Sequence, residues 1–265
     1  MLQTGDSTAP TLELARMEDD WNSYFCKVND SLASIYLNMG LMQDAPMLSK
    51  NWLLWVWVYF NQPRPDGLSS SDEAPVLFKI EDKLNEQMKT QFGAILSGRI
   101  TTEGRREFYF YGEHNNGLAD CVASVLGAFN DYEFDCGSQE DTTWNQYLNV
   151  LYPSEEELQK MKNRDVLEIL ERQGDIHTVV REVSHWFYFQ TAAQRDGFLK
   201  DAMQVGYREG KRFSGGHELR PFGIIIHRDQ AATSDSIDEA VIELFRLAKH
   251  HGAEYDGWET SVEKT

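Results

Sequence analysis

The sequence contains few cysteines and no long apolar segment. Its three cysteines, Cys26, Cys121 and Cys136, are not in CxxC spacing. They cannot form a disulfide framework, and one must stay unpaired, which is typical of the reducing cytosol. The most apolar run, residues 52–60, is far shorter than the roughly 20 residues of a membrane-spanning helix. Residues 1–10 lack the basic and apolar regions of a signal peptide. We therefore expect a cytoplasmic protein without membrane contact.

Positive charge is also scarce. The 265 residues carry 25 Lys and Arg against 43 Asp and Glu, giving a net charge of −18. Such a field repels phosphate backbones and anionic membrane surfaces, which argues against a general nucleic-acid binder. It permits a protein partner with a basic surface, although acidic surfaces also serve solubility alone. The 41% hydrophobic content supports a packed core and excludes a wholly disordered chain, and the length indicates two domains.

Catalytic motifs are absent. The chain has no HExxH, no GxxxxGK[ST], no GxSxG and no GxGxxG after a strand. His250 and His251 are adjacent, so on a helix they point about 100° apart and are poorly placed to share a metal ion. A better explanation is that both histidines lie in the last turn of a helix, where a protonated imidazole complements the helix dipole. We therefore predict a protein that is not an enzyme, with no catalytic residues, no metal and no cofactor.

The first half, residues 1–150, predicts an antiparallel sheet. Two pairs of strand-like segments flank Asn29-Asp30 and a turn ending at Gly104, as in hairpins. The run 52–60 reads as a central strand buried on both faces, and apolar residues at helical spacing follow over 71–91 and 118–129. A short strand is expected at 132–136. The order strand–helix–strand–strand–helix–strand predicts helices on one face of a ferredoxin-like unit.

Residues 151–176 predict a helical linker. Ser154 and Glu157 have the spacing of a capping box, Gly174 ends the pattern, and a break is expected near Asn163. From 177 to 265 we expect a second βαββαβ unit. Its predicted strands are 179–190, 207–213, 222–228 and 258–262, and its predicted helices are 192–205 and 236–251, begun by capping boxes at Thr191 and Ser236.

Strand alternation assigns opposite faces to neighbouring aromatic residues. Phe187 and Phe189 are expected to pack against Phe198 and Leu244, which leaves Trp186 on the open face of the sheet. There it is covered by the first domain or available to a partner. A partner is one of two interpretations of the segment Tyr255-Asp256-Gly257-Trp258, the other being a helix-to-strand turn with Trp258 packed on the sheet.

Three further groups admit a chemical and a structural interpretation. His185 and His227 on neighbouring strands form a pH-sensitive or metal-binding pair, or are separately hydrogen-bonded; we favour the second. Asp120-Cys121 and Asp135-Cys136 form a thiol site with His114, or Cys121 on its apolar helix stripe is a buried small hydrophobe, which is more common. A basic cluster contacts an acidic peptide or RNA, or is a solvated sheet edge; we favour the edge. Its residues are Arg208, Lys211, Arg212 and Arg220, with Tyr207 and Phe213.

Two segments of the second half carry a family resemblance. Arg181-Glu-Val-Ser-His-Trp-Phe-Tyr-Phe189 and Ala253-Glu-Tyr-Asp-Gly-Trp-Glu259 lie at opposite ends of the predicted unit. Together they resemble the type B regulators of ribonuclease E activity over residues 178–263. The resemblance implies a ferredoxin-like fold and a protein-binding role, because well-known members inhibit an RNA-degrading endonuclease by binding its non-catalytic region.

The first half resembles the domain of unknown function 695 family. The matching pieces are the strand 52–60, Ile80-Glu-Asp-Lys-Leu84 and Gly98-Arg-Ile-Thr-Thr-Glu-Gly-Arg105. This family is found ahead of regulator domains of the kind described above.

The sequence therefore predicts a two-domain α+β protein that acts as a non-enzymatic regulator, with ribonuclease E-type RNA decay as the candidate process. The candidate partner-binding residues are Trp186, Tyr255, Asp256 and Trp258. The partner is expected to be a protein with a basic surface, with no direct nucleic-acid binding. The alternative is an unrecognised enzyme or small-ligand binder with its site between the two domains. The sequence indicates no oligomeric state.

Overall fold

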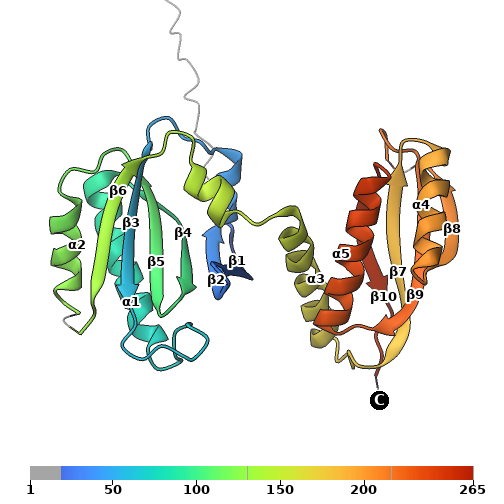
Figure 1. Cartoon of the computed structure of the whole chain (residues 1–265), viewed down its shortest axis with the longest axis horizontal. Helices are drawn as coiled ribbons and strands as arrows, with labels where there is room; N and C mark the ends of the chain where they lie inside the picture. Colours follow the sequence, from blue (N-terminus) through green and yellow to red (C-terminus); the bar gives the residue numbers. More distant parts are fainter. Residues whose placement is uncertain (1–18, 130, 216, 265) are drawn as a thin grey trace, which may run out of the picture. The chain divides into compact units, whose positions relative to one another are not determined.

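A computed structural model describes residues 19–264 apart from 130 and 216, and Figure 1 shows the chain coloured along its length. The sequence predicts that residues 1–10 are not a signal peptide. These residues lie outside the part of the chain that the structure describes. The chain divides into two compact units, Met1–Tyr152 and Pro153–Thr265. None of the described helices is both long and apolar enough to cross a membrane.

The first unit is a six-stranded antiparallel sheet with helices α1 and α2 (Figure 1). Along the sheet the strands follow the order β1-β2-β4-β5-β3-β6. The elements are β1 (Trp21–Val28), β2 (Ser31–Asn38), η1 (Met39–Gln43), β3 (Trp52–Tyr59), α1 (Ala74–Phe92), β4 (Ile95–Thr102), β5 (Arg105–Gly112), α2 (Leu118–Leu126), β6 (Phe134–Glu140) and η2 (Gln146–Leu151).

The strands β3, β4, β5 and β6 have ferredoxin-like topology. Taken in chain order as strands one to four, they lie in the order four-one-three-two, with every neighbouring pair antiparallel. The hairpin of β1 and β2 pairs with β4 and extends the sheet beyond this unit. Positive φ angles at Asn29 and Asp30 fit the two-residue turn that the sequence predicts there. The predicted ferredoxin-like unit is therefore present, with an added hairpin.

The prediction that the run 52–60 is buried on both faces holds only in part: Leu53, Leu54, Val56 and Val58 are buried, whereas Trp55 and Trp57 are half-buried and Tyr59 is exposed. On one face, Leu54, Val56 and Val58 of β3 pack against the apolar stripes of α1 and α2. On the other face, the segment after β6 covers the sheet: Trp144 stacks on Tyr111 with ring centroids 4.0 Å apart. This second cover has no helical periodicity, and the sequence did not reveal it.

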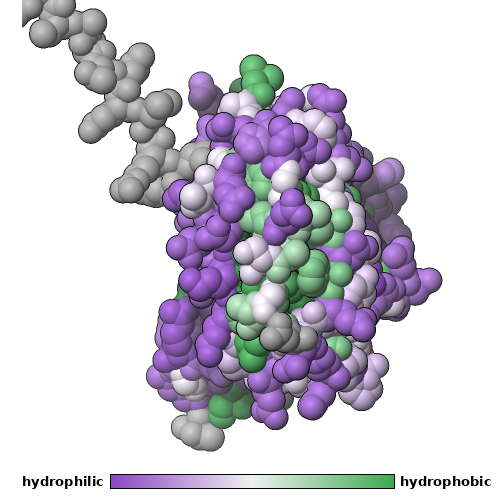
Figure 2. Space-filling model, turned by 90° about the vertical axis from the view of Figure 1, so that its left-hand side faces the viewer, coloured by the Kyte–Doolittle hydropathy of each residue, from purple (hydrophilic) through white to green (hydrophobic). Residues whose placement is uncertain are grey.

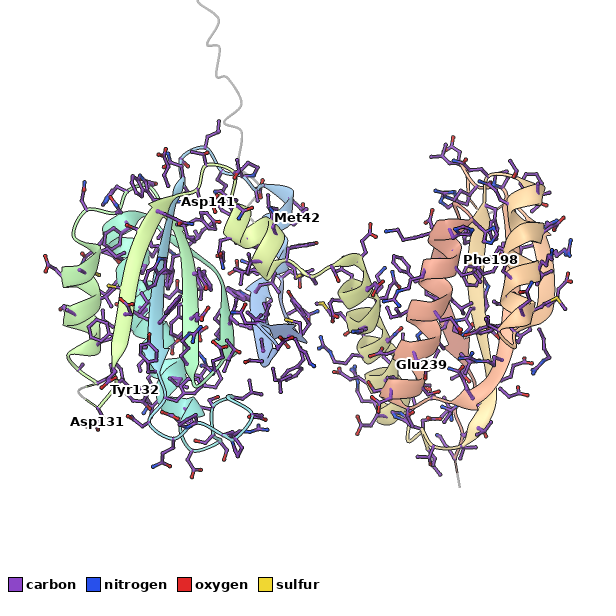
Figure 3. The ribbon with its side chains drawn as sticks, in the orientation of Figure 1. Met42, Asp131, Tyr132, Asp141, Phe198 and Glu239 are labelled. Carbon is purple, nitrogen blue, oxygen red and sulfur yellow. The ribbon has the colours of Figure 1, made fainter. Side chains whose placement is uncertain are left out.

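Asp141 fixes that covering segment in place (Figure 3). Its carboxylate accepts hydrogen bonds from the Tyr111 hydroxyl at 2.6 Å and from the backbone N–H groups of Asn145 and Gln146 at 2.8 and 3.0 Å. These bonds favour the ionised carboxylate and outweigh its burial, so the pKa of Asp141 is lowered. The tyrosine partner of this carboxylate is buried, and its pKa is raised well above the usual range.

The second unit has a four-stranded antiparallel sheet in the order β10-β7-β9-β8. This is again the ferredoxin-like order, as predicted. Helices α4 and α5 pack on one face of the sheet, and Phe198 of α4 lies in the core between them (Figure 3). The elements are α3 (Glu155–Arg172), β7 (Val180–Phe189), α4 (Ala192–Gln204), β8 (Arg208–Ser214), β9 (Phe222–Ala231), α5 (Ser234–His250) and β10 (Glu254–Thr260).

Helix α3 is part of the second unit by its packing. Ser154 accepts the Glu157 N–H at 3.2 Å, which begins the helix where the sequence predicts. The predicted break at Asn163 is wrong, because the helix is continuous there. The Asn163 side chain is buried, donates to Asp238 of α5 at 2.8 Å and accepts from the Trp258 indole at 2.9 Å. A polar residue in this helix thus marks a buried contact and not an interruption.

Three other boundaries also differ from the predictions. The strand predicted at 132–136 is β6, which begins two residues later and continues to Glu140. Helix α5 begins after Thr233, so the capping box predicted at Ser236 is wrong; the box at Thr191 is present with both hydrogen bonds. The last strand begins at Glu254, four residues before the predicted start, because a β-bulge lets it continue through Gly257 at φ 146°.

Candidate functional site

The face of the second sheet opposite α4 and α5 carries a group of aromatic and apolar side chains. Trp186 and Tyr188 of β7 alternate with the fully buried Phe187 and Phe189, as predicted, and both outward residues stay half-buried. The Phe213 ring lies edge-on to Tyr188 at 5.6 Å. We call this surface the open face. In the described part of the second unit, helices α4 and α5 pack against the opposite face of the sheet.

Two glycines shape the open face. A Cβ at Gly223 would lie 2.1 Å from the Phe213 ring, so the missing side chain admits that ring onto the sheet. Gly257 pairs with Trp186 across the strands and leaves open space beside it. The result is a shallow depression lined by Trp186, Tyr188, Asp256, Gly257, Trp258 and Glu259.

Acidic side chains border this depression. Asp256 and Glu259 of β10 line the depression and are exposed. Asp256 is the extra residue of the bulge, between the pairs Tyr255–Phe187 and Gly257–Trp186. An aromatic centre with an acidic border is suited to a protein surface that combines apolar and basic groups.

The structure separates the four predicted site residues. Trp186 and Asp256 lie together at the depression. Tyr255 is only 9% exposed, and its hydroxyl bonds to His185 Nδ1 at 3.0 Å within the core. Trp258 is half-buried and held by its bond to Asn163. Alternation separates Tyr255 from Asp256, and the bulge then places Gly257 opposite Trp186 and turns Trp258 to the core-facing side, opposite His185.

His185 and His227 do not form a site. His185 is fully buried beside Tyr255, whereas His227 lies on the open face, where its Nδ1 is 2.8 Å from the Ser184 hydroxyl. The separate-hydrogen-bond interpretation therefore holds. Burial, with the charges of Arg228 and His227, lowers the pKa of His185 to about 3.

The other candidate groups are structural. Cys121 is buried in the core of the first unit, and burial raises the pKa of its thiol. His251 Nε2 lies 2.9 Å from Asp201. In the basic cluster, Arg208 pairs with Glu182 and Asp229, and Arg212 pairs with Glu209 and Asp196. Over the residues that the structure describes, no group of three or more His, Cys, Asp or Glu is arranged to hold a metal ion.

The first unit presents a largely hydrophilic surface with an elongated apolar strip in the view of Figure 2. Tyr59 at the end of β3 is 36% exposed and Phe134 at the start of β6 is 38% exposed. These outward aromatics provide matched positions for control substitutions.

Comparison with known proteins covers both units. Residues 19–152 match the model of a family of unknown function, DUF695. Residues 160–260 match the model named regulator of ribonuclease activity B. No curated protein matches the chain.

Two solved structures align over most of the chain at low similarity. An unknown protein from Galdieria sulphuraria is 8% identical, with a TM-score of 0.21, and the alignment covers 80% of this chain and 99% of that one. A protein from Bacteroides thetaiotaomicron is 9% identical, with a TM-score of 0.17 and coverage of 78% and 92%. The family models identify the chain more directly: it belongs to the DUF695 family, and its second unit matches the regulator of ribonuclease activity B.

Proposed function

We propose that this protein is a non-enzymatic regulator whose second unit binds a protein of the ribonuclease E type through the open face. The family match of residues 160–260 supports a regulatory role. The observation that carries the choice of surface is the half-buried Trp186 beside exposed acidic residues. Tryptophan in a shallow, partly desolvated position is a frequent centre of protein-binding energy.

The partner surface is proposed to be basic. The chain carries a net charge of −18, and Asp256 and Glu259 add negative charge at the depression itself. RNA-degrading enzymes display basic RNA-binding segments that an acidic protein can occupy. We place the regulatory region in residues 177–265, with α3 packed against it, and the interaction in the cytoplasm, in keeping with a chain that has only three cysteines, none in CxxC spacing.

Association with this partner should weaken as salt rises. Exposed charges are screened over about 10 Å at 0.1 M salt, so an acidic surface attracts a basic one less strongly at higher concentration. The measurement is a titration of the full chain against the non-catalytic region of the source cell's own ribonuclease E-type enzyme at two salt concentrations. The double variant D256N/E259Q should show a weaker salt dependence than the wild type.

A matched control removes the same charge elsewhere. Glu168 and Glu171 are exposed on α3, and the double variant E168Q/E171Q should keep the wild-type salt dependence at the open face. Absence of binding at low salt by a folded sample would remove the ribonuclease proposal. Binding that is insensitive to salt would discard its electrostatic basis.

A further inference from the structure

A second candidate site lies in the first unit, where the hairpin of β1 and β2 joins the rest of its sheet. There a hollow of about 250 Å³ is lined by three arginines, Arg64, Arg99 and Arg106. We call it the arginine hollow. In a chain with 18 excess negative charges, three guanidinium groups at one hollow are not a consequence of composition.

The floor of the arginine hollow consists of two cross-strand rows. They run over β1, β2, β4 and β5 on the face that carries α1, and directly paired residues share one face of a sheet. The ferredoxin-like strands alone would lack the β1 and β2 part of this floor, so the added hairpin builds the hollow. The rows are Phe25–Ser34–Thr101–Arg106 and Ser23–Tyr36–Arg99–Phe108.

Arg106 is the buried cation of the hollow and lacks a full set of acceptors. It is 4% exposed, and its Nε donates to the Thr101 hydroxyl at 3.3 Å. Its Nη1 is buried without a hydrogen-bond partner, with the nearest Glu81 oxygen 4.0 Å away. Burial lowers the pKa of Arg106 to about 10, still well above neutrality. A buried charged donor without an acceptor is costly, which indicates that an acceptor is supplied from outside the chain.

Arg99 and Arg64 supply charge at different depths. The Arg99 guanidinium lies over the Tyr36 ring, 4.4 Å from its centroid, and bonds to Glu81, so its position is fixed before any ligand arrives. Arg64 stands at the rim with its side chain 53% exposed and bonds to Asp66 at 2.5 Å. Ser69 also lines the hollow.

We propose that the arginine hollow binds the phosphate group of a small phosphorylated molecule. A phosphate has more acceptor oxygens and more charge than a carboxylate, and guanidinium forks match its geometry. The size of the hollow suits a small molecule, since ligand pockets for drug-sized compounds begin near 300 Å³. Phe25 and Leu68 provide apolar surface at the same hollow for the organic part.

The test is isothermal titration of the full chain with inorganic phosphate and with glycerol phosphate, and with acetate as the carboxylate probe. Both phosphates should bind, and acetate should bind at least about tenfold more weakly. The variant R106Q should weaken phosphate binding about tenfold or more, and R64Q severalfold. R172Q removes one positive charge from an exposed position on α3, 72% exposed, and should bind phosphate as the wild type does.

Three results would overturn the proposal. The folded wild type could fail to bind either phosphate, acetate could bind as well as phosphate, or R172Q could weaken binding as much as R64Q. If R106Q does not fold, R64Q decides the matter, because its side chain lies at the rim and is not part of the core. These outcomes do not depend on the proposed ribonuclease binding, which is assigned to the open face of the second unit.

Discussion

Replacing Phe187 with alanine is expected to lower the free energy of unfolding of the second unit by about 3–5 kcal/mol. Phe187 is fully buried, with its ring 4.4 Å from Phe198 and 5.0 Å from Tyr255 between centroids. Removing the ring loses this packing and leaves a cavity among residues that are held by the sheet. Typical domains are stable by only about 5–15 kcal/mol, so the change should be large enough to shift a denaturation curve visibly.

The measurement is urea unfolding of the full chain, followed by hydrogen exchange in peptides that cover β7 and β9. The matched control is Tyr188→Ala, the next residue along the strand, whose half-buried side chain lies on the open face. Its cost should be closer to about 1 kcal/mol. Equal losses for both variants would contradict the assignment of Phe187 to the core and Tyr188 to the open face.

The second unit should also lose stability on mild acidification, through His185. In an unfolded chain histidine takes up a proton near pH ~6.5, whereas burial holds the pKa of folded His185 at about 3. Between these values the unfolded state binds more protons than the folded state. The free energy of unfolding therefore falls as the pH falls from about 6.5 towards 3, and the stability is fully present above that window.

The size of this loss follows from the pH interval. Each unit of pKa difference is worth about 1.4 kcal/mol, so this one histidine should cost roughly 2 kcal/mol by pH 5 and several kcal/mol by pH 3. His185→Phe should remove this part of the pH dependence, and His250→Gln, at an exposed position, should keep it. Urea unfolding at pH 7.5 and pH 5 compares the three proteins. An unchanged pH dependence in His185→Phe would contradict a buried neutral imidazole.

Local patterns were sufficient to predict the two ferredoxin-like units. Alternation along β7 separates Trp186 from Phe187, helical spacing locates the stripes of α4 and α5, and the capping box at Thr191 locates a helix start. These features depend on residues within a few positions of each other, so they can be read without knowing the fold. The hairpin turns are similarly local, since they require positive φ at named positions.

The candidate sites depended on contacts that no local pattern contains. Tyr255, Asp256 and Trp258 were grouped because they are near in sequence, but a bulge after Tyr255 turns Trp258 to the core-facing side of the sheet, opposite the buried His185. Asn163 indicated a helix break, although a partner 95 residues away satisfies its side chain. The arginine hollow needs the hairpin of β1 and β2 to pair with β4, which carries Arg99 and itself pairs with Arg106 of β5, and no local pattern contains these pairings.

The most direct test of the open face is a titration of three folded proteins against the non-catalytic region of the ribonuclease E-type enzyme. These are the wild type, Trp186→Ala, and Tyr59→Ala as an outward aromatic control in the first unit. Trp186→Ala should weaken binding at least about tenfold, because removal of a central tryptophan commonly costs 2 kcal/mol or more. Tyr59→Ala should bind as the wild type does. Equal affinity of all three proteins, or a loss confined to Tyr59→Ala, would contradict the open face as the binding surface.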